Sequence, residues 1–238
     1  MKHVSKVLAA ASIAILSTGA HAAIVKYRYD AQVTAVTEYD PATDIYTDVG
    51  SSAFAGTAVA VGDRISGVFQ FDSFAGLSSY QPAQTPGAIV RSYDAGATDF
   101  ISYVDQDSAL AFTSMPSLNW LGMSFVQDSA PVPGAFATDS FLMTLPATDG
   151  AFFNGATMWL ADAYGNAFGS AGMPSTLDLA AFQSAGMEAG FLRISDKAYM
   201  GFSADLTSLE RVDVPEPGSL CLFAIAGSAL LRTRRKRA

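Results

Sequence analysis

Histidine and cysteine are almost absent from this 238-residue chain, and neither type occurs between residues 23 and 213. The two histidines are His3 and His21, and the single cysteine is Cys221. A Ser-His-Asp triad, a Cys-His pair and metal sites built on histidine or thiolate ligands are therefore excluded from this central region. Disulfide bonds are excluded as well, so the stability of the region must come from packing.

Basic residues are also scarce in the central region. Residues 23–213 contain seven lysines and arginines against 21 aspartates and glutamates, a formal charge of −14, whereas the whole chain carries −8. Such a surface repels phosphate backbones, so nucleic acid is not expected as a partner. Neither a Walker-type phosphate loop nor a dinucleotide-binding glycine motif is present.

The N-terminus predicts a secretory signal peptide. Two lysines precede the apolar stretch 7–16, and Ala20 and Ala22 supply the small residues that signal peptidase requires, with cleavage after Ala22. We therefore expect residues 1–22 to direct export and to be removed. The remaining residues 23–213 are long enough for one secreted domain.

The C-terminal 25 residues combine three features. Pro215, Glu216 and Pro217 are followed by the uncharged apolar run 219–231 and then by a basic tail. The basic residues of the tail are Arg232, Arg234, Arg235, Lys236 and Arg237. A helix over the apolar run would be about 20 Å long, shorter than the roughly 30 Å hydrocarbon core of a bilayer. The basic cluster would stay on the cytoplasmic side, so the central region would lie outside.

This segment resembles the PEP-CTERM sorting signal of Gram-negative bacteria. The resemblance rests on the Pro215-Glu216-Pro217 motif, the apolar run and the basic tail, in that order within residues 214–238. It implies a precursor tethered transiently in the inner membrane and cut by exosortase, a membrane-embedded cysteine protease-like enzyme. It also implies a final location at the cell surface or in the extracellular polysaccharide matrix.

The central region alternates between apolar and polar residues in many short segments, as half-buried strands do. In the first segment, Val25, Tyr27 and Tyr29 share one face. Ten strands are predicted, at 25–33, 64–71, 88–93, 100–104, 109–112, 118–126, 141–145, 158–163, 191–195 and 198–206. This pattern predicts a mainly β fold, an antiparallel β-sandwich with a jelly roll as one candidate topology.

One short helix is expected beside the strands. Ser175 and Asp178 form a capping box, and Gly186 marks the end of the helix.

Carboxylates carry the chemistry that remains open. Asp94, Asp99, Asp105 and Asp107 cluster around one predicted strand and are the candidate calcium ligands, although their spacing matches no regular calcium loop. No other metal or cofactor is expected. A glycoside hydrolase that uses paired acids is a weaker alternative, because no local signature selects a pair.

Aromatic residues provide candidates for sugar stacking. Trp120 and Trp159 lie in apolar segments, which favours core packing, whereas Tyr80, Tyr103 and Tyr164 are the more exposed candidates. We therefore predict a non-enzymatic structural protein, sorted by exosortase and associated with the extracellular polysaccharide matrix. The alternative is a calcium- or carbohydrate-binding adhesin module.

Overall fold

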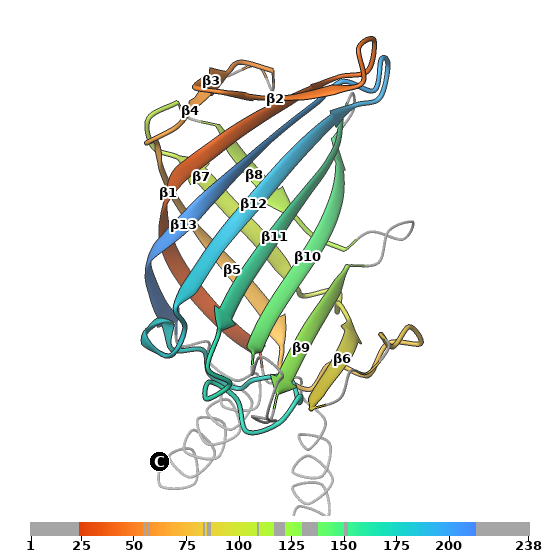
Figure 1. Ribbon diagram of the computed structural model, residues 1–238, viewed down its shortest axis with the longest axis vertical. Helices are drawn as coiled ribbons and strands as arrows, with labels where there is room; N and C mark the ends of the chain where they lie inside the picture. The colour runs from red at the N-terminus through yellow and green to blue at the C-terminus, as the bar shows by residue number, and fades with distance from the viewer. Residues whose placement is uncertain are drawn as a thin grey trace, which may run out of the picture.

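The computed structural model describes residues 24–54, 56, 58–82, 84, 87–108, 110–116, 122–129, 138–149 and 152–212. Within these ranges the chain forms antiparallel strands and one turn of 3-10 helix, Leu179–Ala181 (Figure 1). The strands are β1 (Ile24–Asp40), β2 (Ile45–Val49), β3 (Ser51–Ser52), β4 (Val59–Ala60), β5 (Arg64–Asp72), β6 (Ala88–Asp94), β7 (Phe100–Asp105), β8 (Ala111–Ser114), β9 (Met123–Ser129), β10 (Asp139–Asp149), β11 (Phe152–Asp162), β12 (Ser184–Arg193) and β13 (Tyr199–Val212). The mainly β, antiparallel class predicted from the sequence is confirmed.

Eleven strands form one sheet, in the order β6-β9-β10-β11-β12-β13-β1-β5-β7-β8, with β2 paired to the end of β1. The sheet curls until β8 contacts β10 and β11 (Figure 1). The Ser114 hydroxyl donates to the Leu145 carbonyl across the interior. The predicted sandwich of two sheets is therefore corrected to one strongly curled sheet. The physical reason is that the 17-residue β1 pairs with β13 on one side and β5 on the other, which keeps both halves hydrogen-bonded.

The interior of the curled sheet holds the hydrophobic core. Alternate residues of β1 point inward, and Tyr27 and Tyr29 are buried there. Tyr27 stacks on Phe69 with 5.3 Å between the ring centroids, and Phe71 lies 5.0 Å from Phe141. Aromatic contacts thus join β1 and β5 to β10, on the other side of the interior.

The segment between β11 and β12 packs against residues of the interior. Leu177 and Phe182 of this segment are buried, and the Leu177 N–H donates to the Tyr27 hydroxyl. The Tyr93 hydroxyl donates to the Ala171 carbonyl at 2.6 Å. This segment is therefore part of the core although it contains almost no regular structure.

The helix predicted between Ser175 and Gly186 is wrong. Asp178 does cap a turn, with its carboxylate accepting a backbone N–H at 3.0 Å, but only Leu179–Ala181 are helical. Strand β12 begins at Ser184, so Gly186 lies inside a strand. A short isolated helix is marginal, whereas residues 184–186 pair with β11 and Gly186 also pairs with β13.

Each of the ten predicted strands overlaps one observed strand, although residues 118–121 lie outside the described part of the chain. The sequence did not predict β2, β3 and β4. All but one of the β2 residues are exposed, so no alternation of apolar and polar residues marks that strand.

Two glutamine side chains cover the backbone of the edge strand β6. The Gln84 amide donates to the Val90 carbonyl at 2.8 Å and accepts from the Val90 N–H at 2.9 Å. Gln81 bonds the carbonyl and the N–H of Ser92 in the same way. Each amide takes the place of a neighbouring strand, which protects an edge that would otherwise recruit another chain.

We expect the double variant Gln81→Ala/Gln84→Ala to associate as its concentration rises, because the backbone groups of β6 become available for strand pairing. Light scattering of the full chain in detergent, over a series of concentrations, measures this. Gln70→Ala is the matched control, since it removes a glutamine bonded to the Thr98 carbonyl. A mass equal to that of the wild type at every concentration would contradict the protective role.

Candidate functional site

The sorting and leader residues lie outside the described part of the chain. These residues are Ala20, Ala22, Pro215, Glu216, Pro217, Arg232, Arg234, Arg235, Lys236 and Arg237. The structure does place their points of attachment, because Lys26 near the start of β1 and Val212 at the end of β13 are cross-strand partners. Both terminal segments therefore attach at the same end of the sheet. No helix among the residues that the structure describes is long and apolar enough to cross a membrane.

The structure does not bring all four candidate calcium ligands, Asp94, Asp99, Asp105 and Asp107, together. Asp105 and Asp107 do lie near each other, because burial is the larger cause of the raised pKa of the neighbouring Asp63 carboxyl and both aspartates raise it further. Asp99 and Asp105 are buried at opposite ends of β7, and their carboxylates accept nearby backbone N–H groups. Asp94 is exposed, and Asp107 forms an ion pair with Arg64 at 3.4 Å. Within the described ranges, no three histidine, cysteine, aspartate or glutamate side chains form a metal-binding group.

Burial gives Asp99 an unusual ionisation. Its burial raises the pKa of the carboxyl to about 6, although hydrogen bonds from the N–H groups of Gly96 and Asp72 oppose the shift. An aspartate in an unfolded chain has a pKa of about 3.9. Between these two values the folded chain binds a proton that the unfolded chain does not. The charged form of Asp99 therefore lowers the free energy of unfolding above pH 6. The free energy of unfolding rises as the pH falls from 6 toward 4 and Asp99 becomes protonated.

Thermal unfolding tests the ionisation of Asp99. On going from pH 7 to pH 5, we expect the wild-type chain to gain about 1 kcal/mol relative to Asp99→Asn, a few degrees in Tm. The asparagine variant lacks the titrating proton, so contributions from the other carboxylates cancel in the comparison. Parallel pH profiles for the two proteins would show that the pKa of Asp99 is not raised.

Asp139 and Asp162 face each other across β10 and β11, and both are buried. Paired acids of this kind are what a carboxylate-dependent hydrolase needs. Asp139 accepts the N–H groups of Ser129 and Phe168, and Asp162 accepts three from the loop 164–167. Burial disfavours the charged form of Asp162, but these hydrogen bonds outweigh it and lower the pKa of its carboxyl. The pair therefore holds the loop after β11 in place.

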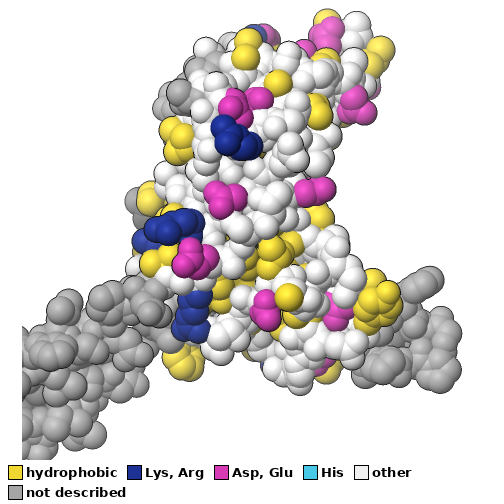
Figure 2. All heavy atoms as spheres, turned by 90° about the vertical axis from the view of Figure 1, so that its left-hand side faces the viewer, with side chains coloured by type: hydrophobic (Ala, Val, Ile, Leu, Met, Phe, Trp, Pro, Cys, Tyr) yellow, Lys and Arg dark blue, Asp and Glu magenta, His cyan; other side chains and the backbone are white. Residues whose placement is uncertain are grey.

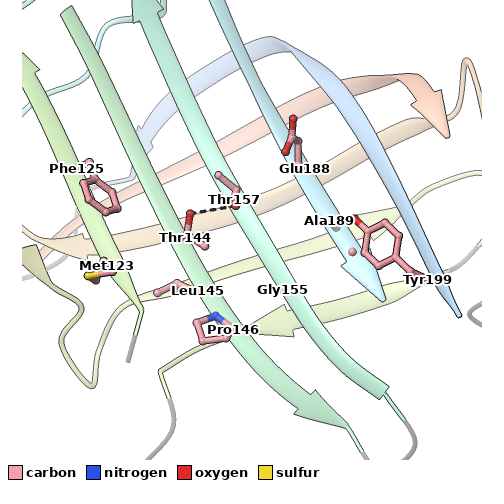
Figure 3. A pocket seen from close by; sticks show the side chains of 11 residues that line it. Met123, Phe125, Thr144, Leu145, Pro146, Gly155, Thr157, Glu188, Ala189 and Tyr199 are labelled. Atoms are coloured by element: carbon pink, nitrogen blue, oxygen red, sulfur yellow. Dashed lines mark hydrogen bonds between the residues drawn. The ribbon is translucent and has the colours of Figure 1, made fainter. Parts of the chain in front are cut away.

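A groove of about 420 Å³ lies on the outer face of the sheet, over β9 to β13. Figure 3 shows Met123 and Phe125 on one side of the groove and Tyr199 on the other. The Thr144 and Thr157 hydroxyls between them are hydrogen-bonded at 3.1 Å (Figure 3). The groove therefore combines aromatic walls with hydroxyl groups on its floor.

Three successive rows of outward-facing residues cross the sheet at the groove. The rows are Phe125-Leu142-Trp159-Gly186-Asp205, Met123-Thr144-Thr157-Glu188-Ser203 and Pro146-Gly155-Gly190-Gly201. The first row is apolar except for Asp205 on β13, the second carries hydroxyl and carboxylate groups, and the third is rich in glycine. Side chains of one row are near neighbours, so each row acts as a unit.

Trp159 lies on the outer face and covers Gly186. A Cβ atom on Gly186 would come within 2.6 Å of Cζ2 of the indole, so only glycine permits this approach. Gly186 is buried as a result, while Trp159 is half-buried. The prediction that Trp159 packs in the core is wrong, because the buried neighbours Met158 and Leu160 occupy the inward positions of β11. Trp120 lies outside the described residues.

Tyr199 covers a pair of facing glycines in the same way. Gly190 and Gly201 are cross-strand partners, and a Cβ atom on Gly190 would lie 2.7 Å from the Tyr199 ring. Burial, followed by the charge of Glu188, raises the pKa of the Tyr199 hydroxyl, which stays neutral at physiological pH. The ring of Tyr46, which is 66 % exposed, lies 6.5 Å away and extends the aromatic surface.

The sequence identifies the aromatic surface only in part. Tyr80 and Tyr164 are exposed as expected, but Tyr103 is buried in the core. Tyr199 and Trp159 were not selected as sugar-stacking residues. Both residues are marked by the outward-facing glycines that they cover. Which glycines face outward beside which ring is known only from the strand pairing.

Charged groups are dispersed over the surface. On the side shown in Figure 2, lysine and arginine side chains are interspersed with aspartate and glutamate. Arg28 pairs with Glu210 at 3.7 Å, and both side chains are largely exposed, so the pair contributes little to stability. The described part of this face carries no continuous basic patch that would attract a polyanion.

Comparison with known proteins identifies the C-terminal segment. Residues 213–236 match the family model of the PEP-CTERM protein-sorting motif, which spans the predicted motif, the apolar run and most of the basic tail. No curated protein and no solved structure matches the chain. Such a signal is recognised by exosortase, and it implies export and a membrane-anchored precursor. The chain is thus a PEP-CTERM domain-containing protein, with its sorting motif at residues 213–236.

Proposed function

We propose that this chain is a non-enzymatic structural protein of the cell surface, cut from its tether by exosortase and retained in the extracellular polysaccharide matrix. The observation that carries the proposal is the PEP-CTERM motif at residues 213–236. A leader that ends at Ala22 would start export through the inner membrane. Processing near Pro215–Pro217 would then release the acidic domain.

The end of the sheet supports release of an intact domain. Strand β13 pairs with β1 as far as Val212, and the matched sorting segment begins at residue 213. A cut within the motif therefore removes no described strand. The domain keeps all its strand pairing when it leaves the membrane.

The chemistry of the domain supports a role without catalysis. Residues 23–213 contain no histidine or cysteine. The facing carboxylates of Asp139 and Asp162 accept backbone N–H groups, which favours a structural role over acid-base work. We therefore assign no catalytic residue.

Fractionation of cultures tests association with the matrix. In the producing strain, the processed protein should be recovered with the extracellular polysaccharide. In an otherwise identical strain that cannot make this polysaccharide, it should appear in the culture medium. The same distribution in both strains would contradict matrix association. Processing by exosortase is a separate readout, and the size of the product measures it.

A further inference from the structure

We propose that the outer face of β9 to β13 binds a neutral polysaccharide chain of gluco-configured sugars, laid along β12 between Trp159 and Tyr199. This inference rests on the proposed association with extracellular polysaccharide and assigns that association to one surface. The surface consists of the three residue rows. Tyr199 lines the groove, and Trp159 lies beside it, two positions from the lining residue Thr157 on β11.

The two aromatic rings lie against the sheet backbone. Trp159 covers Gly186, and Tyr199 covers Gly190 and Gly201, so one side of each ring is in contact with glycine. Trp159 and Tyr199 are both half-buried, so part of each residue remains accessible to a ligand. Pyranose rings with equatorial hydroxyls present flat faces of C–H groups, and such faces stack on exposed aromatic rings. The two rings are therefore suitable platforms for sugars.

The spacing of the rings indicates a chain rather than a single sugar. Gly186 and Gly190, which lie beneath the two rings, are four residues apart on β12, a distance of about 13 Å along a strand. This distance is longer than one pyranose ring. A ligand that contacts both Trp159 and Tyr199 must therefore contain several linked sugars, and affinity should rise with chain length.

Polar groups lie between the two platforms. Glu188 is midway along β12 between the two glycines and is exposed. Thr157, its cross-strand partner, is hydrogen-bonded to Thr144. Figure 3 shows these side chains between Phe125 and Tyr199. Carboxylate and hydroxyl oxygens are acceptors for sugar hydroxyls, so the middle row supplies the hydrogen bonds that stacking alone does not.

Charge selects a neutral polymer. The groove is lined by Glu188, and no lysine or arginine is among its described lining residues. Residues 23–213 also carry a formal charge of −14. An acidic polysaccharide would be repelled by this negative charge, and no basic side chain of the groove would offset the repulsion. A neutral glycan would not be repelled.

Affinity electrophoresis of the full chain in detergent tests the proposal. We expect gels that contain hydroxyethylcellulose, a neutral β-glucan, to retard the wild-type protein, and gels that contain anionic alginate to leave its mobility unchanged. In solution, cellohexaose should bind more tightly than cellotriose. Trp159→Ala and Tyr199→Ala should each weaken binding about fivefold or more, because each variant lacks one aromatic stacking surface.

Matched variants separate binding from folding. Tyr199→Phe keeps the ring and should retain most of the affinity, and Tyr164→Ala removes an exposed tyrosine outside the groove and should bind like the wild type. Thermal unfolding verifies that each variant is folded. If Tyr199→Ala fails to fold, the proposal is still tested by Trp159→Ala, because Trp159 faces outward.

Three binding results would overturn the inference. They are no retardation of the wild type by the neutral glucan, equal binding by the wild type and both alanine variants, and stronger binding to alginate. A dimer that Trp159→Ala converts to a monomer, with no glucan binding, would assign the surface to a second copy of the chain and also overturn it. Exosortase processing should be normal in every variant, so a failed platform and a failed sorting function give different results.

Discussion

The Asp162→Ala variant should unfold about 6–12 °C below the wild-type chain. Asp162 is buried, and its carboxylate accepts three backbone N–H groups of the following loop at 2.6 to 3.0 Å. Its removal leaves these donors without their acceptor, which costs about 3 kcal/mol or more. For a domain of this size, 1 kcal/mol corresponds to about 2–4 °C in Tm.

The loss should depend on pH in a defined direction. The pKa of Asp162 is lowered by folding, so its contribution is fully present above about pH 4, the pKa of an unfolded aspartate, and is lost as the pH falls through the folded value. The Tm values of the wild type and Asp162→Ala should therefore converge in acid.

An exposed aspartate provides the control. Asp196 also accepts a backbone N–H in a turn, from Ala198 at 3.2 Å, but its side chain is half exposed. Water can replace that hydrogen bond, so Asp196→Ala should unfold close to the wild-type temperature. Equal losses for Asp162→Ala and Asp196→Ala would show that burial of the loop anchor does not matter.

Glu216→Ala, or deletion of residues 232–237, should leave most of the protein as unprocessed precursor in the membrane fraction. Glu216 is the only charged residue in 214–231, so it is the distinctive feature that exosortase can recognise beside the apolar run. Basic residues beside an apolar segment favour the cytoplasmic side, so we expect the segment to lose its orientation when the tail is deleted. Immunoblots of membrane and medium fractions measure both effects.

The control for the sorting variants is Glu210→Ala. Glu210 is exposed near the end of β13, and its substitution removes an acidic group just before the motif. It should be processed like the wild type. Normal processing of Glu216→Ala and of the tail deletion would remove the basis for assigning exosortase as the partner.

The strands were predictable because burial repeats with a period of two residues. Val25, Tyr27 and Tyr29 alternate with polar residues, and all three are buried as predicted. The curl of the sheet was not predictable, because the same alternation fits two separate sheets and one curled sheet. Only the pairing of β1 with both β13 and β5 distinguishes them.

The positions of the candidate carboxylate and aromatic residues depend on strand pairing, which cannot be read from the sequence alone. Asp99 and Asp105 are close in the sequence, but a strand separates them, so they do not form a calcium cluster. Asp139 and Asp162 are far apart in the sequence, yet the register of β10 and β11 places them opposite each other. Trp159 lies in an apolar run, and only its register reveals that it faces outward over Gly186.

The most direct test of the account is the mass of the C-terminal peptide of the protein, with and without exosortase. In a strain that contains exosortase, we predict a product that ends near Pro215–Pro217. In the matched strain without the enzyme, we predict a membrane-bound chain that still carries the basic residues 232–237. The same C-terminus in both strains, whether cut or intact, would contradict the account.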